Sequence, residues 1–361
     1  MEANKIDTLK AQIETQRNLL NTDRMDISFG EIMSMYERQE IVIKPAFQRY
    51  FRWDEEQRTR FIESLLLGIP VPPIFVAEDG TGVWELVDGL QRISTVLSFF
   101  GVLRSEDEGI KSKNGWALTE GDRVEALEGF DYETLPNLFR LNLKRATCRV
   151  EIIRWNSSYD MRFELFNRLN TGGSPLTAQE IRNCIYRDIS SKFNDFLKKL
   201  AEQKDFMALI DLDEEQRERL YHEELALRFI SLHKNIKNVR TSIAQHMTSF
   251  MKLALDDDHF DYAKYERDFT NVFALLRPLG RDIFRQADGK FATALYDVIT
   301  IGVGENYSYY KSKSSKVISD KIDREVRTDA VLRKFSRRGG NNQRERIINR
   351  LREAKRIFGK T

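Results

Sequence analysis

The sequence has only two cysteines and four histidines among its 361 residues. Cys148 and Cys184 fall in a predicted strand and a predicted helix, which argues against a disulfide framework and a cysteine zinc site. The histidines are too scattered for a metal cluster. No stretch approaches the roughly 20 apolar residues of a membrane span, and the first ten residues lack the apolar core of a signal peptide. We therefore expect a cytoplasmic protein that does not contact membranes.

Common catalytic motifs are also missing, since the sequence contains no HExxH, no GxxxxGK[ST] and no GxSxG. The charge is unevenly distributed. Residues 311–361 carry 17 Lys and Arg against 6 Asp and Glu, so the first 310 residues have a net charge of −9 within an overall charge of +2. A basic C-terminal segment favours contact with DNA or an acidic partner. It is equally consistent with a segment that folds back onto the acidic body.

The hydrophobic periodicity predicts an α+β domain followed by an all-α domain. Residues 1–25 are predicted to form an amphipathic helix, with Ile6, Leu9, Ile13 and Leu20 at near-heptad spacing. Its own body is the expected docking surface, and another copy of the chain is the alternative. Residues 26–157 alternate strands and helices, with a hairpin at "IFVAEDGTGVWELVDG" and a helix that Asp54 caps. The helix is predicted to run to Ile69 and to bury it. A polar insertion spans about 104–145.

From residue 158 the pattern is helical. Residues 158–310 form the predicted helical domain, and residues 311–361 form a basic tail that ends in a helix. At "TGGSPLTAQE" the glycines end one helix, and Thr177 with Glu180 predicts a capping box for the next.

The segment "VDGLQR" joins a predicted strand to a predicted helix. Asp88 and Gln91 have the spacing of a capping box, which needs no ligand. Arg92 is unexpected, because the positive end of the helix dipole disfavours a cation in the first turn. A glycine turn, exposed backbone amides and an arginine make an anion site. The structural alternative is a salt bridge from Arg92 to a nearby acid such as Glu85.

Two further segments carry polar or aromatic groups. The loop "KPAFQRYFRW" gathers cations and aromatic rings that suit a phosphate and a stacked base, although its aromatic residues could equally belong to the core. The segment "NRLNTGGSPLTAQEIRN" is rich in amides, but a helix connection with glycines needs no function.

The segments "PAFQRYFRW", "FIESLLLGIPVPPIFV", "LVDGLQRISTVLSFF" and "FNRLNTGGSPLTAQEIRN" together resemble the GmrSD N-terminal domain family. That family has a DGQQR motif in a fold related to ParB and sulfiredoxin. The resemblance covers about residues 26–200. Leu90 stands where the motif has its first glutamine, so this chain lacks any direct role of that side chain.

The resemblance implies a site that binds or hydrolyses a nucleoside triphosphate with Mg²⁺. Asp88, Gln91 and Arg92 would be the catalytic residues, with Arg92 on the phosphates and Asp88 as helix cap or metal ligand. The other expected binding residues are Lys44, Gln48, Arg49, Arg52, Trp53, Gly89, Asn167, Asn170 and Thr171. As general base, Asp88 and Glu63 are the candidates.

Better-known members of that family act in anti-phage systems that restrict modified DNA, often with a C-terminal HNH nuclease domain. No HNH motif occurs in this sequence, so cleavage would come from a nuclease partner or from the ParB-like domain itself. A nucleotide-hydrolysing, DNA-contacting regulator is the first hypothesis. A metal-dependent DNA nuclease and a non-catalytic scaffold are the alternatives, and a homo-oligomer stays open.

Overall fold

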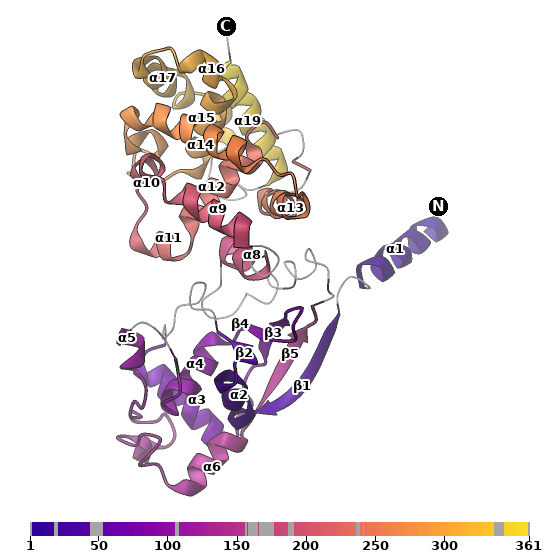
Figure 1. The fold of residues 1–361 in the computed structure, drawn as a ribbon, viewed down its shortest axis with the longest axis vertical. Coiled ribbons are helices and arrows are strands. Elements are labelled where there is room, and N and C mark those ends of the chain that lie inside the picture. Colours follow the sequence, from indigo (N-terminus) through magenta and orange to yellow (C-terminus); the bar gives the residue numbers. More distant parts are fainter. Residues whose placement is uncertain are drawn as a thin grey trace. The chain divides into compact units, whose positions relative to one another are not determined.

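The structure is a computed structural model, and it describes residues 2–17, 21–43, 53–104, 108–155, 157, 165, 177–186, 191–235, 239–240, 242–335 and 343–359. The chain divides into two compact units, Met1–Leu176 and Thr177–Thr361. The first contains a five-stranded sheet and the second is helical, which confirms the predicted α+β class (Figure 1). The division falls after Leu176, whereas the sequence placed it near residue 157.

The sheet of the first unit has the strand order β1-β5-β3-β4-β2. Its strands are β1 (Thr22–Ser28), β2 (Ile41–Val42), β3 (Ile74–Glu78), β4 (Trp84–Asp88) and β5 (Thr147–Ile153). β1 pairs with β5 and β3 with β4 in antiparallel fashion, while β3–β5 and β2–β4 are parallel. The β3–β4 pair is the predicted hairpin. Asp79 closes its loop by accepting the backbone N–H groups of Thr81 and Val83 at 2.8 and 3.0 Å.

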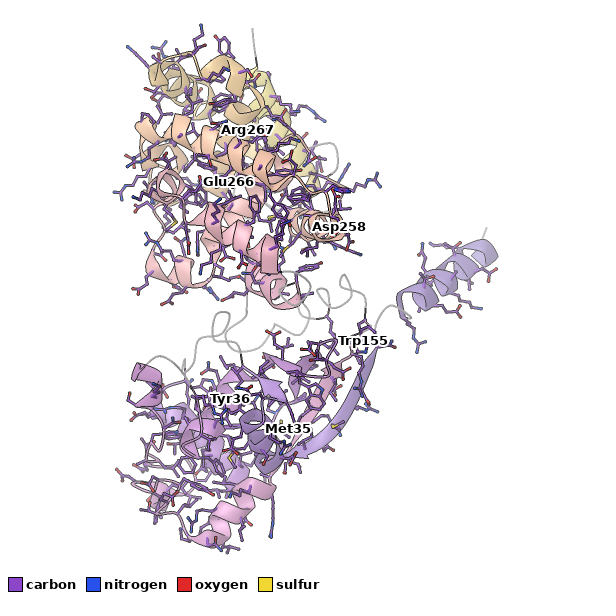
Figure 2. All side chains as sticks on the ribbon, in the orientation of Figure 1. Met35, Tyr36, Trp155, Asp258, Glu266 and Arg267 are labelled. Atoms are coloured by element: carbon purple, nitrogen blue, oxygen red, sulfur yellow. The ribbon has the colours of Figure 1, made fainter. Side chains whose placement is uncertain are left out.

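Four helices supply apolar side chains to one core with the sheet: α2 (Phe29–Glu37), α3 (Glu55–Leu66), α4 (Leu90–Phe99) and α6 (Asn137–Arg145). α2 is anchored by buried Tyr36, which Figure 2 labels. Its hydroxyl accepts the backbone N–H of Arg104 at 3.1 Å. Asp54 caps α3 in a complete capping box with Gln57, as predicted. The helix ends at Leu66, however, so Ile69 lies beyond it and is exposed rather than buried.

The segment 104–145 contributes to this core although its sequence is polar. It contains α5 (Glu108–Lys111), the 3₁₀ turn η2 (Glu125–Leu127) and α6. Its contacts with the core come from widely spaced buried leucines, namely Leu118, Leu127, Leu135 and Leu143. Glu63 of α3 is buried and accepts the backbone N–H groups of Arg123 and Val124, both at 2.8 Å. This carboxylate therefore fixes the loop, which accounts for Glu63 without a role as general base.

The N-terminal helix α1 (Glu2–Arg17) forms as predicted, but its apolar face is not covered. Ile6, Leu9 and Ile13 are each about half exposed. The expected docking of this face on the body is therefore wrong for these three side chains.

The second unit consists of helices. They are α8 (Ala178–Tyr186), α9 (Ser191–Ala201), α10 (Lys204–Ile210), α11 (Glu214–Glu218), α12 (Tyr221–Leu232), α13 (Ile243–Asp256), α14 (Tyr262–Leu276), α15 (Thr293–Glu305), α16 (Tyr307–Tyr310), α17 (Ser315–Lys321), α18 (Ala330–Phe335) and α19 (Arg344–Phe358), with short turns η4 (Arg277–Leu279), η5 (Arg281–Phe284) and η6 (Ile322–Val326). Among the residues that the structure describes, none of the helices has both the length and the apolar character needed to cross a membrane.

α15 is the centre of this unit, and the basic helix α19 packs against it. A Cβ at Gly302 of α15 would lie 2.3 Å from the Phe358 ring, so the absent side chain is what lets α19 approach. Buried Asp297 of α15 pairs with both Arg228 of α12, at 2.5 and 2.7 Å, and Arg350 of α19, at 3.2 Å. The basic C-terminal helix is therefore part of the core of the second unit, as the fold-back alternative requires.

Candidate functional site

The turn between β4 and α4 is built around Gly89. β4 ends at Asp88, and α4 begins at Leu90. Gly89 has φ +102°, in the left-handed region where an L side chain is strained. A Cβ at this position would also lie 2.5 Å from Cγ2 of Ile74 on the neighbouring strand. Only glycine fits, because both the backbone angle and the contact with β3 exclude a side chain.

Arg92 lies in the first turn of α4 and is mostly buried, with 13% of its side chain exposed. Its Nη2 donates to Oδ2 of Asp88 at 2.8 Å and to the carbonyl oxygen of Pro73 at 3.2 Å. Its Nε is buried and has no hydrogen-bond partner within the described ranges. The predicted salt bridge to an acid exists, but the partner is Asp88 and not Glu85. One edge of the guanidinium is thus paired, while Nε is an unsatisfied donor.

The predicted capping box of Asp88 and Gln91 is wrong. The N-cap of α4 is Gly89, whose backbone angle turns the chain one residue later than expected. Gln91 instead accepts the backbone N–H of Trp53 at 3.1 Å. Because Trp53 directly precedes the cap of α3, this bond brings the first turns of α3 and α4 together. The bond therefore links the segment that precedes α3 to the first turn of α4, which also carries Arg92.

The ring of Trp53 packs at 5.5 Å from that of Phe61 and against the hydrophobic core. The Trp53 ring therefore belongs to the hydrophobic core, which was the alternative to stacking on a base. Its contact with Gln91 is made by the backbone N–H. The other predicted binding residues lie outside the described residues. These are Lys44, Gln48, Arg49, Arg52, Asn167, Asn170 and Thr171.

Asp88 is the carboxylate that the turn offers to a ligand, with 44% of its side chain exposed. Its Oδ2 pairs with Arg92, and its Oδ1 has no hydrogen-bond partner within the described part of the chain. No group of three or more His, Cys, Asp or Glu among the described residues could hold a metal ion. Mg²⁺, however, is commonly held by one or two carboxylates together with substrate phosphates. The turn by itself therefore supplies one carboxylate, fewer ligands than a resident metal site needs.

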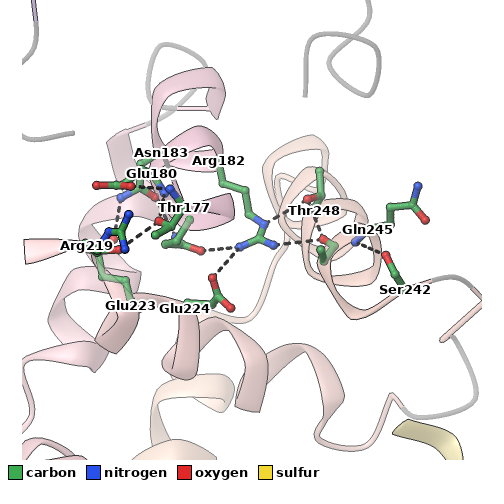
Figure 3. A network of polar contacts seen from close by, with 12 residues as sticks. Thr177, Glu180, Arg182, Asn183, Arg219, Glu223, Glu224, Ser242, Gln245 and Thr248 are labelled. Atoms are coloured by element: carbon green, nitrogen blue, oxygen red, sulfur yellow. Dashed lines mark hydrogen bonds and ion pairs between the residues drawn. The ribbon is translucent and has the colours of Figure 1, made fainter. Parts of the chain in front are cut away.

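A second polar cluster, in the helical unit, was not predicted from the sequence (Figure 3). Arg182 of α8 is fully buried, which lowers its pKa, and it donates to Gln179, Thr248 and the carbonyl oxygen of Ala244. Asn183 donates to Glu223 of α12 at 2.7 Å. The buried polar groups of the cluster thus have partners on neighbouring helices, and the cluster joins α8 to α12 and α13. The amide-rich motif thus has a structural explanation at its C-terminal end.

The predicted capping box at the start of α8 is confirmed. Glu180 accepts the backbone N–H of Thr177, and Thr177 accepts the backbone N–H of Glu180 at 3.2 Å. The Thr177 hydroxyl also donates to the carbonyl oxygen of Arg219 at 3.1 Å, which ties the cap to the segment before α12 (Figure 3).

Comparison with protein families decides the class of the first unit. Residues 29–187 match the family model of the GmrSD restriction endonuclease, N-terminal domain. The chain carries a GmrSD N-terminal domain. The predicted family is thereby confirmed, and the matched residues include the whole β4–α4 turn. No curated protein and no solved structure matches the chain significantly.

The boundary of the GmrSD domain does not coincide with the boundary between the two units. The family match continues to residue 187 and so includes α8, which packs on α12 and α13 in the helical unit. Gln179, Arg182 and Asn183 therefore belong to the matched domain by sequence and to the second unit by packing.

Gly89→Ala should destabilise the first unit by about 1–3 kcal/mol more than Gly82→Ala. Gly82 also has a positive φ, +87°, but a Cβ there meets nothing within 4 Å, so the pair isolates the contact with Ile74. Urea unfolding followed by tryptophan fluorescence measures the difference, because all four tryptophans lie between residues 53 and 155. Equal losses in the two variants would contradict the close approach of Gly89 to β3.

Proposed function

We propose that the GmrSD domain of this chain binds a nucleoside triphosphate at the β4–α4 turn and hydrolyses it as a regulatory step of a restriction system. The unsatisfied Nε donor of buried Arg92, in the first turn of α4, is the observation that carries this proposal. The first backbone N–H groups of a helix have no partner within the helix, and Gly89 has no side chain to cap them. Backbone donors and a guanidinium together recognise phosphate.

Asp88 controls access to Arg92 in this proposal. Its carboxylate pairs with Nη2 at 2.8 Å and offsets the unfavourable position of a cation at a helix N-terminus. A triphosphate brings several negative charges and competes with this single carboxylate. Binding would then satisfy Nε and replace Oδ2 of Asp88 at Nη2 of Arg92.

Hydrolysis requires that water attack the γ-phosphorus while the bond from this phosphorus to the bridging oxygen breaks. The products are inorganic phosphate and the nucleoside diphosphate, which takes the electron pair of the broken bond. Arg92 and the first-turn N–H groups of α4 would stabilise the charge on the phosphate oxygens. A bound Mg²⁺ would neutralise further phosphate charge, and Oδ1 of Asp88 would hold it.

DNA contact is proposed for the basic C-terminal segment. Several of its positive residues pair within the unit, as Lys355 does with Glu305 at 3.5 Å and Arg356 with Asp329. Others are exposed and form no ion pair within the described part of the chain, including Lys311, Lys316 and Arg324. Such side chains suit the DNA backbone. Cleavage of DNA in this system is assigned to a nuclease partner.

Release of inorganic phosphate from ATP, GTP, CTP and UTP, with Mg²⁺ and with or without DNA, tests the nucleotide site. Arg92→Ala should lower turnover about 10²-fold or more, because an oriented donor to the reacting phosphate is lost. The matched control is Arg149→Ala, which removes an exposed arginine of the same unit that pairs with Asp26.

Tryptophan fluorescence verifies that both variants remain folded. A nucleotide at 100 times its dissociation constant should also stabilise the wild type by about 2.7 kcal/mol. Absence of turnover and of nucleotide-dependent stabilisation in the wild type would overturn the proposal, as would equal turnover in Arg92→Ala and the wild type.

DNA binding should be tested by charge reversal, because deleting residues 311–361 would remove α19 from the core. The triple variant of Lys311, Lys316 and Arg324 to Glu should bind DNA more weakly and with a shallower dependence of log affinity on log salt concentration. The matched control changes three exposed lysines of α9, Lys192, Lys198 and Lys199, to Glu. Unchanged affinity in the first triple variant, or equal loss in both, would argue against DNA contact by this segment.

A further inference from the structure

The helical unit contains a polar cavity of about 170 Å³ near the C-terminal end of α12. It lies against α14, α15 and α16, and all of its lining residues are described and belong to this unit. The residues that matter for its chemistry are His233, Lys234, Asp268, Asn271, Gly304 and Glu305. The cavity is independent of the β4–α4 turn, which lies in the other unit.

His233 provides an unused acceptor in the wall of this cavity. The imidazole is 3% exposed and stacks on Phe229 with centroids 5.1 Å apart. Burial, reinforced by the charge of Lys234, lowers the pKa of His233 to about 4, so the ring is neutral at pH 7. Its Nε2 lies 3.6 Å from Oδ2 of Asp268, which favours the tautomer with the proton on Nε2. Nδ1 then has a free lone pair and no partner among the described residues.

Gly304 leaves room beside this lone pair. A Cβ on Gly304 would lie 3.0 Å from Nδ1 and from Cε1 of His233. Glycine within a helix costs about 1 kcal/mol relative to alanine, so its presence in α15 calls for a local reason. The close approach of the imidazole supplies that reason, and it keeps the space beside Nδ1 free of a side chain.

Two carboxylates bind Lys234, the residue after His233, whose backbone is strained. Lys234 has φ +60°, an unfavourable angle for a residue other than glycine. Glu305 accepts its backbone N–H at 2.8 Å, and Asp268 accepts its Nζ at 2.8 Å. Asp268 and Glu305 are themselves mostly buried. Lys355 reaches Glu305 at 3.5 Å from α19 but does not line the cavity.

The charged groups of the lining are therefore mainly anionic. They are two carboxylates against one ammonium group, which Asp268 already binds, and Nδ1 of His233 adds a lone pair. The side chains of Asn271, Tyr307 and Ser308 can each donate or accept. We propose that this cavity binds a small organic cation whose N–H groups donate to Nδ1 of His233 and to the two carboxylates. A free amine or guanidine and the end of a lysine or arginine side chain on a peptide share this chemistry.

Nitrogen-15 chemical shifts of the histidine side chains test the proposal on the full chain. With only four histidines in the sequence, Nδ1 of His233 can be assigned and followed during a titration. Agmatine, putrescine and an acetylated Gly-Arg-Gly amide are the cationic probes, with succinate as the anionic and butanediol as the neutral comparison. A saturable shift of Nδ1 with at least one cationic probe, and none with the comparisons, is expected. A response to the peptide alone would identify a protein side chain as the ligand, and a response to agmatine or putrescine a free cation.

Asp268→Asn should weaken binding of the active probe about tenfold or more, because one charge-assisted hydrogen bond is lost. Asp282→Asn is the matched control, since that carboxylate is in the same unit and 86% exposed. If Asp268→Asn unfolds, the wild-type titration and the affinity of Asn271→Ala for the same probe, which should also be lower, test the proposal in its place. An Nδ1 resonance that no cationic probe moves, or equal affinity in wild type and Asp268→Asn, would overturn the proposal.

Discussion

The close approach of Gly89 to Ile74 is the constraint on which the candidate site depends. A Cβ at position 89 would come within 2.5 Å of the neighbouring strand, so the turn can lie against β3 only with glycine there. This position starts α4 directly at the end of β4 and sets Arg92 four residues after Asp88. Their ion pair at 2.8 Å follows from that spacing. The same turn directs Gln91 to the backbone of Trp53, and so brings the start of α3 to the site.

In the helical unit, buried charged side chains connect helices to one another. Arg228, Asp297 and Arg350 connect α12, α15 and α19 in the core of the unit. Arg182 links α8 to α13 through Thr248 and the carbonyl oxygen of Ala244, and to α12 through Glu224 at 4.0 Å. A buried guanidinium requires defined partners, because leaving one unpaired costs several kcal/mol. These networks thus specify how the helices pack, and they make both the end of the GmrSD match and the basic C-terminal helix integral to the second unit.

The sequence predicted those features that depend on local signals. The β3–β4 hairpin, the caps at Asp54 and Thr177, and the strand, glycine turn and helix around Gly89 were all anticipated. Errors arose where long-range packing decides. Aspartate is a preferred N-cap residue, but the left-handed backbone angle at Gly89 makes Gly89 the N-cap of α4. The carboxylate of Asp88 pairs with Arg92 instead. The burial of Arg182 and the packing of α19 on α15 depend on residues distant in sequence, and an arginine in a helix ordinarily indicates an exposed face. The resemblance to the ParB and sulfiredoxin fold stays a prediction.

In the proposed nucleotide site, a triphosphate takes the place of Asp88 as a partner of Arg92, and the same carboxylate holds Mg²⁺. The most direct measurement is the affinity of a non-hydrolysable triphosphate analogue for wild type and Asp88→Asn, with Mg²⁺ and with EDTA. Without metal, Asp88→Asn should bind more tightly than wild type, because the competing carboxylate is gone. The gain in affinity that Mg²⁺ gives the wild type should be absent in the variant. Equal affinities of the two proteins under both conditions would contradict the claim and leave the Asp88–Arg92 pair as a purely structural element of the turn.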